Sequence, residues 1–153
     1  MHHIVDFFKN PFAITAISSW LIAQVMKFFI HAIVNKKFEL SRLFGDGGMP
    51  SGHSATVCSL AAYTGLVYGF GGFEFAATTV LAVIVCHDAM GVRLETGKQA
   101  ILLNEILKSF TILHEKKLPE VKLKEFVGHS PVQVSAGVIL GITNAFIMYH
   151  FVF

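Results

Sequence analysis

Two histidines stand at the entrances of apolar stretches of this chain. His53 belongs to the segment GMPSGHS at residues 48–54, and His129 belongs to the segment GHSP at residues 128–131. An imidazole at the mouth of one hydrophobic helix, matched by an imidazole at the mouth of another, is hard to explain by packing. Two such groups at one membrane face could act on a single phosphate ester, one as nucleophile and one as general acid. We therefore expect the two rings within about 10 Å of each other.

The residues beside each histidine are typical of helix starts. Ser51 can cap the helix that follows it, which turns the backbone N–H groups of the next residues toward an anion. Gly52 allows the backbone to approach a ligand closely. Ser130 followed by Pro131 is a favoured pair for the N-cap and the first helical position. Each histidine is thus predicted to lie at a helix N-terminus, where phosphate binds readily.

The composition is that of an integral membrane protein. Apolar residues make up 54% of the 153 residues, mean hydropathy is +0.62, and only 14% of residues are charged, against about 25% in soluble domains. The length suits one domain, residues 1–153. The eight histidines and the two cysteines form no compact ligand pattern, so we predict no metal, no cofactor and no nucleic-acid partner. Cys58 and Cys86 lie in apolar stretches and are predicted to be buried thiols.

We predict an all-α bundle of about four transmembrane helices with one amphipathic interfacial helix. The expected spans are residues 12–34, 54–70, 75–92 and 132–152. The second is rich in small residues that allow close helix packing. Between the third and fourth spans, residues 93–128 are more polar, and their apolar positions follow helical spacing. This segment is expected to lie on the membrane surface or to cap the bundle.

Charge predicts the orientation. With four spans, the loops at residues 35–53 and 93–130 share one side. That side carries ten basic residues, against Lys9 alone on the other. The positive-inside rule then places both loops and both histidines on the cytoplasmic side of the inner or plasma membrane.

Three sequence blocks resemble a known family. They are residues 48–54, then DAMGVR at 88–93 with GKQA at 97–100, then GHSP at 128–131 with Gly137. In this order they resemble the divergent branch of the type 2 phosphatidic acid phosphatases, which is related to the acid phosphatases and vanadium haloperoxidases. The resemblance runs over about residues 24–141. It implies a membrane phosphatase that works without a metal.

The resemblance assigns roles to the two histidines. His129 would be the nucleophile that forms a phosphohistidine, and His53 the general acid that protonates the leaving alkoxide. In the parent superfamily an Asp four residues after the nucleophile orients it, whereas this chain has Gln133. A Gln carbonyl can accept that hydrogen bond but carries no charge. Asp88, near the end of the third span, is a candidate to replace the Asp.

The phosphate clamp also departs from the parent pattern, in which an Arg precedes the nucleophile by six residues. Leu123 stands at that position. The candidate phosphate-binding residues are Arg93 and Lys98 of the branch's own block, together with Ser51, Gly52, Lys27 and Arg42. Lys27 shares one helix face with Gln24 and His31, and polar residues inside a membrane usually face the bundle interior.

The sequence leaves three functions open. The first is hydrolysis of a lipid or amphiphilic phosphomonoester, favoured because residues at helix mouths lie at headgroup depth. The second is a catalytically degenerate protein that binds anionic lipid or supports assembly, suggested by Gln133 and Leu123. The third is a small transporter. The expected partners are the lipid phosphate and membrane lipids, and four short helices also leave a homodimer open.

Overall fold

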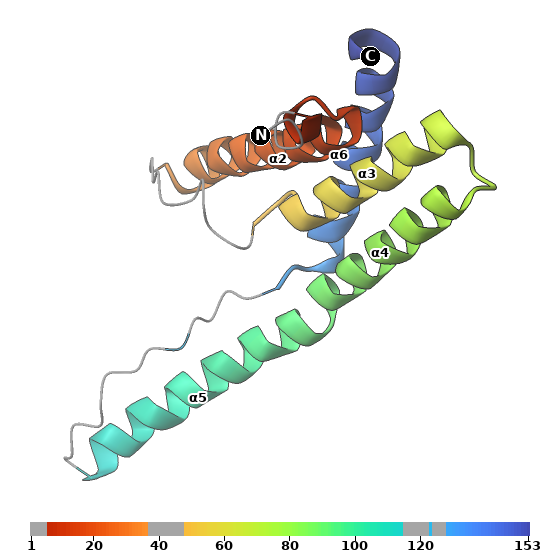
Figure 1. Cartoon of the computed structure of the whole chain (residues 1–153). Helices are drawn as coiled ribbons and strands as arrows, with labels where there is room; N and C mark the ends of the chain where they lie inside the picture. Colours follow the sequence, from red (N-terminus) through yellow and green to blue (C-terminus); the bar gives the residue numbers. More distant parts are fainter. Residues whose placement is uncertain (1–5, 37–47, 115–122, 124–127) are drawn as a thin grey trace.

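The structure, a computed structural model, describes residues 6–36, 48–114, 123 and 128–153. It is helical, with no strand among these residues (Figure 1). The helices are α2 (Pro11–Asn35), α3 (Gly52–Tyr68), α4 (Phe73–Met90), α5 (Val92–His114) and α6 (Pro131–Ile147), which continues as the π-helical turn η2 (Met148–Val152). The predicted all-α architecture is confirmed.

Local chemistry starts three of these helices. The Asn10 side chain accepts a hydrogen bond from the Phe12 N–H at 2.9 Å and caps α2. Ser51 caps α3 by accepting from the Ser54 N–H, and Ser130 caps α6 by accepting from the Gln133 N–H. Pro131 occupies the first turn of α6, where its missing N–H costs nothing. The predicted starts of both histidine-bearing helices are therefore confirmed.

Helix α3 forms the centre of the bundle, because α2, α4 and α6 all pack against it. Its buried residues are mostly small: Gly52, Ser54, Ala55, Ser59, Ala61, Thr64 and Gly65, with Tyr63 as the large exception. Small side chains let neighbouring backbones come close, and close van der Waals contact is the main source of helix association in a membrane. The small-residue pattern of the sequence thus produces a helix surrounded by its neighbours.

The backbones of α3 and α6 approach each other very closely where the two helices cross. Gly137 lies against Ser51 and Ser54, and Gly141, one turn later, lies against Ala55 and Ser59. A Cβ atom built on Gly137 would come 2.5 Å from the Ser51 carbonyl oxygen. No side chain fits in that space, so the two glycines allow α6 to cross directly over the first turns of α3.

A polar cluster joins α6 to α2 farther from the histidines. The Asn144 side-chain amide of α6 donates to the Thr15 carbonyl at 3.2 Å, to Ser18 Oγ at 3.0 Å and to Ser19 Oγ at 2.8 Å, all on α2. Asn144, Thr15 and Ser19 are buried. Interhelical hydrogen bonds of this kind stabilise membrane bundles by about 0.6 kcal/mol on average. They fix how α2 and α6 sit against each other.

Among the described residues, three stretches are long and apolar enough to cross a membrane: Pro11–Asn35, Phe73–Phe110 and Pro131–Val152. The sequence predicted about four. The fourth, α3, has 17 residues, so its length is about 25 Å at 1.5 Å per residue, somewhat less than the ~30 Å hydrocarbon core. Its central position lets it be short, because neighbouring helices rather than lipid cover most of it.

The predicted amphipathic segment is the helix α5. It follows α4 after the single residue Gly91 and projects from the bundle (Figure 1), so it does not cap the other helices. Two hydrogen bonds tie it to the returning chain: Asn104 Nδ2 donates to the Leu123 carbonyl at 3.0 Å, and the Leu123 N–H donates to Asn104 Oδ1 at 3.1 Å. Its exposed apolar side chains, as far as they are described, are Val92, Ile101, Leu102, Leu103, Ile106 and Phe110.

Helices α3 and α4 form an antiparallel hairpin through the turn at residues 69–72 (Figure 1). Cys58 and Cys86 face each other across it, with their Sγ atoms 3.9 Å apart. Both are free and only half-buried. The two thiols therefore form no disulfide, as the sequence predicts, although they are less buried than expected.

The tight α3–α6 crossing can be tested with one methyl group. We expect Gly137→Ala to lower the free energy of unfolding by about 1–3 kcal/mol, because overpacking forces backbones apart, and so to lower the midpoint of thermal unfolding in detergent. Gly71→Ala is the matched control, since a Cβ there would meet nothing within 4 Å. Equal midpoints for the two variants would contradict the crossing.

Candidate active site

The structure brings the two histidines together. His53 lies in the first turn of α3, and His129 lies just before the Ser130 cap of α6. Their ring centroids are 6.4 Å apart, within the distance expected for two groups that act on one phosphate. His129 is buried, with 4% of its surface exposed, whereas His53 is exposed. The His129 ring is thus enclosed by the protein, and the His53 ring lies at the surface.

Backbone contacts hold the segment that carries His129. The His129 N–H donates to the Ala89 carbonyl at 2.9 Å near the end of α4. Gly128 has a φ of +88°, and its Cα lies so close to the backbone of Arg93 and Leu94 that a Cβ would collide with it. Only glycine satisfies both conditions. The segment is therefore fixed against the junction of α4 and α5.

Gln133 connects the N-termini of α6 and α3. Its Oε1 accepts a hydrogen bond from the Ser130 N–H at 3.1 Å, and its own N–H donates to Ser130 Oγ at 3.4 Å, which together form a capping box. Its carbonyl oxygen accepts from the Ser51 N–H at 2.9 Å. One residue thus caps its own helix and holds the cap residue of the other.

The Gln133 side chain also determines which ring nitrogen of His129 carries the proton. Gln133 Oε1 lies 3.3 Å from His129 Nδ1. The Ser130 N–H can only donate, so the amide atom facing it must be the oxygen rather than the nitrogen. That oxygen can only accept, so His129 Nδ1 must carry the proton that it shares with Gln133. In a neutral ring the lone pair is then on Nε2.

Lys27 of α2 lies beside the start of α3. A Cβ built on Gly52 would be 3.6 Å from Lys27 Nζ and 3.3 Å from Trp20 Cδ1. Only 7% of Lys27 is exposed, and Gln24, one turn earlier, is equally buried at 8%. The ammonium group and the first N–H groups of α3 therefore present positive charge to the same region, which favours an anion.

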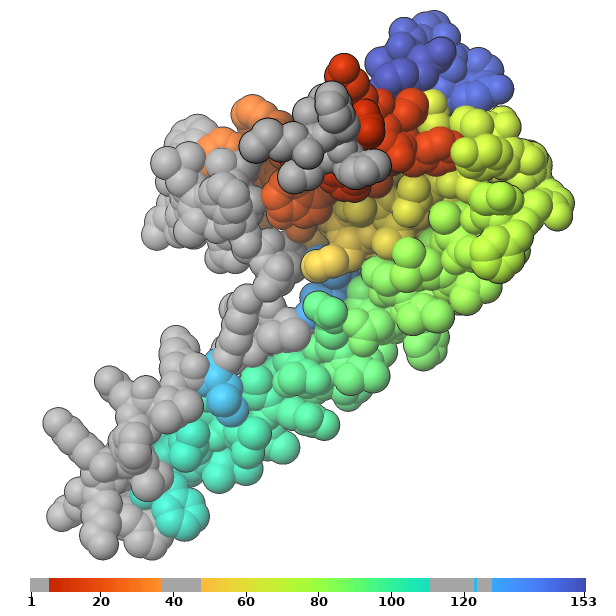
Figure 2. Space-filling model, viewed as in Figure 1, coloured from red at the N-terminus to blue at the C-terminus, as the bar shows by residue number. Residues whose placement is uncertain are grey.

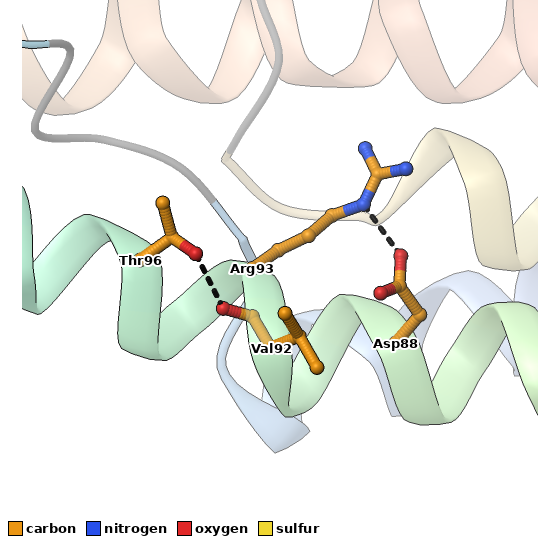
Figure 3. Close-up of polar contacts among 4 residues, drawn as sticks. All are labelled: Asp88, Val92, Arg93 and Thr96. Atoms are coloured by element: carbon orange, nitrogen blue, oxygen red, sulfur yellow. Dashed lines mark hydrogen bonds and ion pairs between the residues drawn. The ribbon is translucent and has the colours of Figure 1, made fainter.

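Arg93 and Asp88 form an ion pair at the α4–α5 junction, with Arg93 Nε 2.6 Å from Asp88 Oδ2 (Figure 3). Both side chains are about half exposed, at 54% and 41%, so the pair adds little stability. The two terminal guanidinium nitrogens point away from Asp88 (Figure 3). Asp88 thus contacts Arg93, while the oxygen at His129 Nδ1 belongs to Gln133.

The remaining predicted residues are less central or not described. Lys98 lies farther along α5 and pairs with Glu95 at 2.7 Å, with both side chains exposed. Arg42 lies outside the described residues. Leu123, at the position of the parent Arg, contributes its backbone to the bonds with Asn104. Among the described residues, no three His, Cys, Asp or Glu side chains gather as metal ligands would.

A groove of about 330 Å³ begins at His53. It is lined by Ile17 and Trp20 of α2, His53, Thr56 and Val57 of α3, and Val85 of α4. Apart from His53, none of these residues belongs to a sequence pattern that marks a site. Apolar side chains on a membrane helix look alike in a sequence, and only the spacing of α2 and α4 around α3 reveals which of them face a common space.

The role of Lys27 can be tested by binding alone. Inorganic phosphate should raise the thermal midpoint of the wild-type protein, since a ligand at 100 times its Kd stabilises by about 2.7 kcal/mol. We expect Lys27→Met to lose this shift and Lys9→Met to keep it, because Lys9 is exposed before the start of α2. Equal shifts in both variants would exclude Lys27 as a phosphate ligand.

Comparisons with known proteins agree with this architecture. The Divergent PAP2 family matches residues 8–144. The chain is 34% identical over 147 residues to the uncharacterized membrane protein YuiD of Bacillus subtilis (strain 168), which covers 90% of this chain and 93% of the relative. No solved structure matches the chain significantly. With the three membrane-length apolar stretches found in its described part, the chain is a membrane protein, and it belongs to the Divergent PAP2 family.

Proposed function

We propose that this protein is a metal-independent phosphatase that hydrolyses a lipid or amphiphilic phosphomonoester through a phosphohistidine. The observation that carries the proposal is the 6.4 Å separation of the His53 and His129 rings at the joined N-termini of α3 and α6. Family membership supports a phosphatase-related membrane protein. The difference in burial supports different roles for the two rings, with buried His129 as the nucleophile and exposed His53 as the general acid.

In the first step, the lone pair on His129 Nε2 attacks phosphorus in line with the ester oxygen. The N–P bond forms as the P–O bond breaks, and protonated His53 gives its proton to the leaving alkoxide. In the second step, His53, now neutral, takes a proton from water. The hydroxide equivalent attacks phosphorus, the N–P bond breaks, and inorganic phosphate leaves with the His129 ring restored.

Positive charge stabilises the equatorial oxygens in both steps. Lys27 and the N–H groups of the first turn of α3 supply it from one side. Arg93 is the candidate on the other side: its backbone lies against Gly128, beside His129, and its terminal nitrogens are directed away from Asp88 (Figure 3). A guanidinium can contact two phosphate oxygens at once.

We infer a lipid substrate from the depth at which the two histidines lie in the membrane. His53 and His129 lie at helix ends rather than mid-helix, so they sit near the headgroup layer of a bilayer, where a lipid phosphate already lies. The cytoplasmic orientation of this face is part of the proposal and rests on the charge asymmetry of the sequence.

A second function has its own support. Gln133 at His129 is neutral, and Leu123 replaces the parent Arg. A neutral acceptor stabilises the imidazolium that develops during attack less than a carboxylate does. The same pocket would then bind anionic lipid phosphate without turning it over. Phosphate release separates the two functions.

Phosphate release from lipid phosphates in detergent with EDTA tests catalysis. His129→Ala should abolish turnover, because no other group forms the covalent intermediate. His53→Ala should lower the rate about 10²–10⁴-fold, and less for substrates with good leaving groups. Gln133→Glu, which keeps the side-chain length, should maintain or raise the rate because it adds charge. His150→Ala, exposed in η2, is the control. Turnover at the wild-type rate in folded His129→Ala protein would contradict the mechanism.

Orientation can be tested by labelling intact cells with an impermeant maleimide. In a background without Cys58 and Cys86, we expect Lys9→Cys to react and Lys98→Cys to react only after the membrane is opened. Both side chains are exposed, so accessibility in the folded protein does not differ. The reverse pattern would place the histidines on the outer face.

A further inference from the structure

We propose that the groove beside His53 binds one alkyl chain of the substrate, which enters sideways from the membrane between α2 and α4. This inference rests on the proposed function, because it names the part of the substrate that the site recognises besides the phosphate. It assigns substrate selection to Trp20, Val57 and Val85, none of which takes part in the chemistry.

The groove follows from the packing of the bundle. α2 and α4 both pack on α3 but hardly touch each other in the described part of the chain, so α3 becomes the floor between two walls. Figure 2 shows α3 in yellow at the surface between α2 in red to orange and α4 in green. Ile17 and Trp20 on one wall are 43% and 36% exposed. The groove is therefore open toward lipid.

The lining is apolar, and one end of the groove lies beside the histidine pair. Thr56 is a polar residue of the floor, but its hydroxyl donates to the Gly52 carbonyl at 2.7 Å. Trp20 Nε1 would lie 3.7 Å from a Cβ on Gly52, so the indole N–H is at the phosphate end. His53 belongs both to the groove and to the histidine pair. A single amphiphile would thus place its phosphate at the histidines and its chain along Val57 and Val85.

The volume of the groove suits one alkyl chain. A volume of about 330 Å³ equals roughly eleven water volumes of ~30 Å³ each, and a methylene group is of similar size. The groove therefore suits about ten carbons of a single chain, and the second chain of a diacyl lipid would remain in the bilayer. A water-soluble phosphate ester such as a sugar phosphate would leave this apolar space unfilled.

Photolabelling tests binding without requiring turnover. The probe is dodecyl phosphate with a diazirine near the end of its chain, added to the His129→Ala protein in detergent. We expect crosslinks on peptides that contain Trp20, Val57 or Val85, and we expect unlabelled dodecyl phosphate to compete. The same probe with a hydroxyl in place of the phosphate should label the groove at least severalfold less. Crosslinks confined to other faces, or equal labelling by the alcohol, would overturn the proposal.

Chain-length dependence tests selection in the active protein. For alkyl phosphates from butyl to dodecyl, kcat/KM should rise by up to ~4-fold per methylene group and level off near ten carbons. Val57→Trp or Val85→Phe should fill the groove and move the plateau to shorter chains. Val83→Trp is the control, because Val83 is 63% exposed on α4 and does not line the groove.

The two experiments separate failure of this inference from failure of the proposed function. Groove crosslinks without phosphate release would support the alkyl-chain site and reject the phosphatase. Phosphate release that does not depend on chain length, with unchanged behaviour of Val57→Trp and Val85→Phe, would keep the phosphatase and reject the alkyl-chain site.

Discussion

The hydrogen bond from the Ser51 N–H to the Gln133 carbonyl, 2.9 Å long, is the contact on which the site depends. It joins the cap of α3 to the first turn of α6. It acts together with the glycine crossing at Gly137 and Gly141, which also holds the start of α6 against α3. With it, two residues that are 76 positions apart in the sequence, His53 and His129, share one space. Gln133 then adds a second constraint, since its amide oxygen fixes the proton on His129 Nδ1.

Features that depend on near neighbours were predictable from the sequence. Ser51, Ser130 and Pro131 act within one helical turn, so their capping roles follow from residue type. The contact of Gln133 with His129 spans four residues, and the resemblance to the acid phosphatases pointed to that position. The helical membrane architecture followed from composition and from the apolar stretches.

Features that depend on tertiary packing were not predictable. Asp88 was expected as a candidate acceptor for His129, but in the structure it pairs with Arg93, five residues away, and the oxygen at the His129 ring belongs to Gln133. The hydrogen bonds from Asn144 to Thr15, Ser18 and Ser19 join residues more than 120 positions apart. The groove arises from the distance between α2 and α4, for which no short sequence pattern exists.

The account makes His129 a covalent catalyst, and trapping the intermediate tests that claim most directly. A ³²P-labelled alkyl phosphate mixed with the purified protein and quenched in alkali within milliseconds should leave label on the peptide that contains His129. The bond should be stable to alkali and labile to acid, as phosphohistidine is. His53→Ala protein should hold more label at steady state with a good leaving group, because hydrolysis of the intermediate also needs that ring. Turnover with no label on His129, or label in an acid-stable ester, would contradict the account.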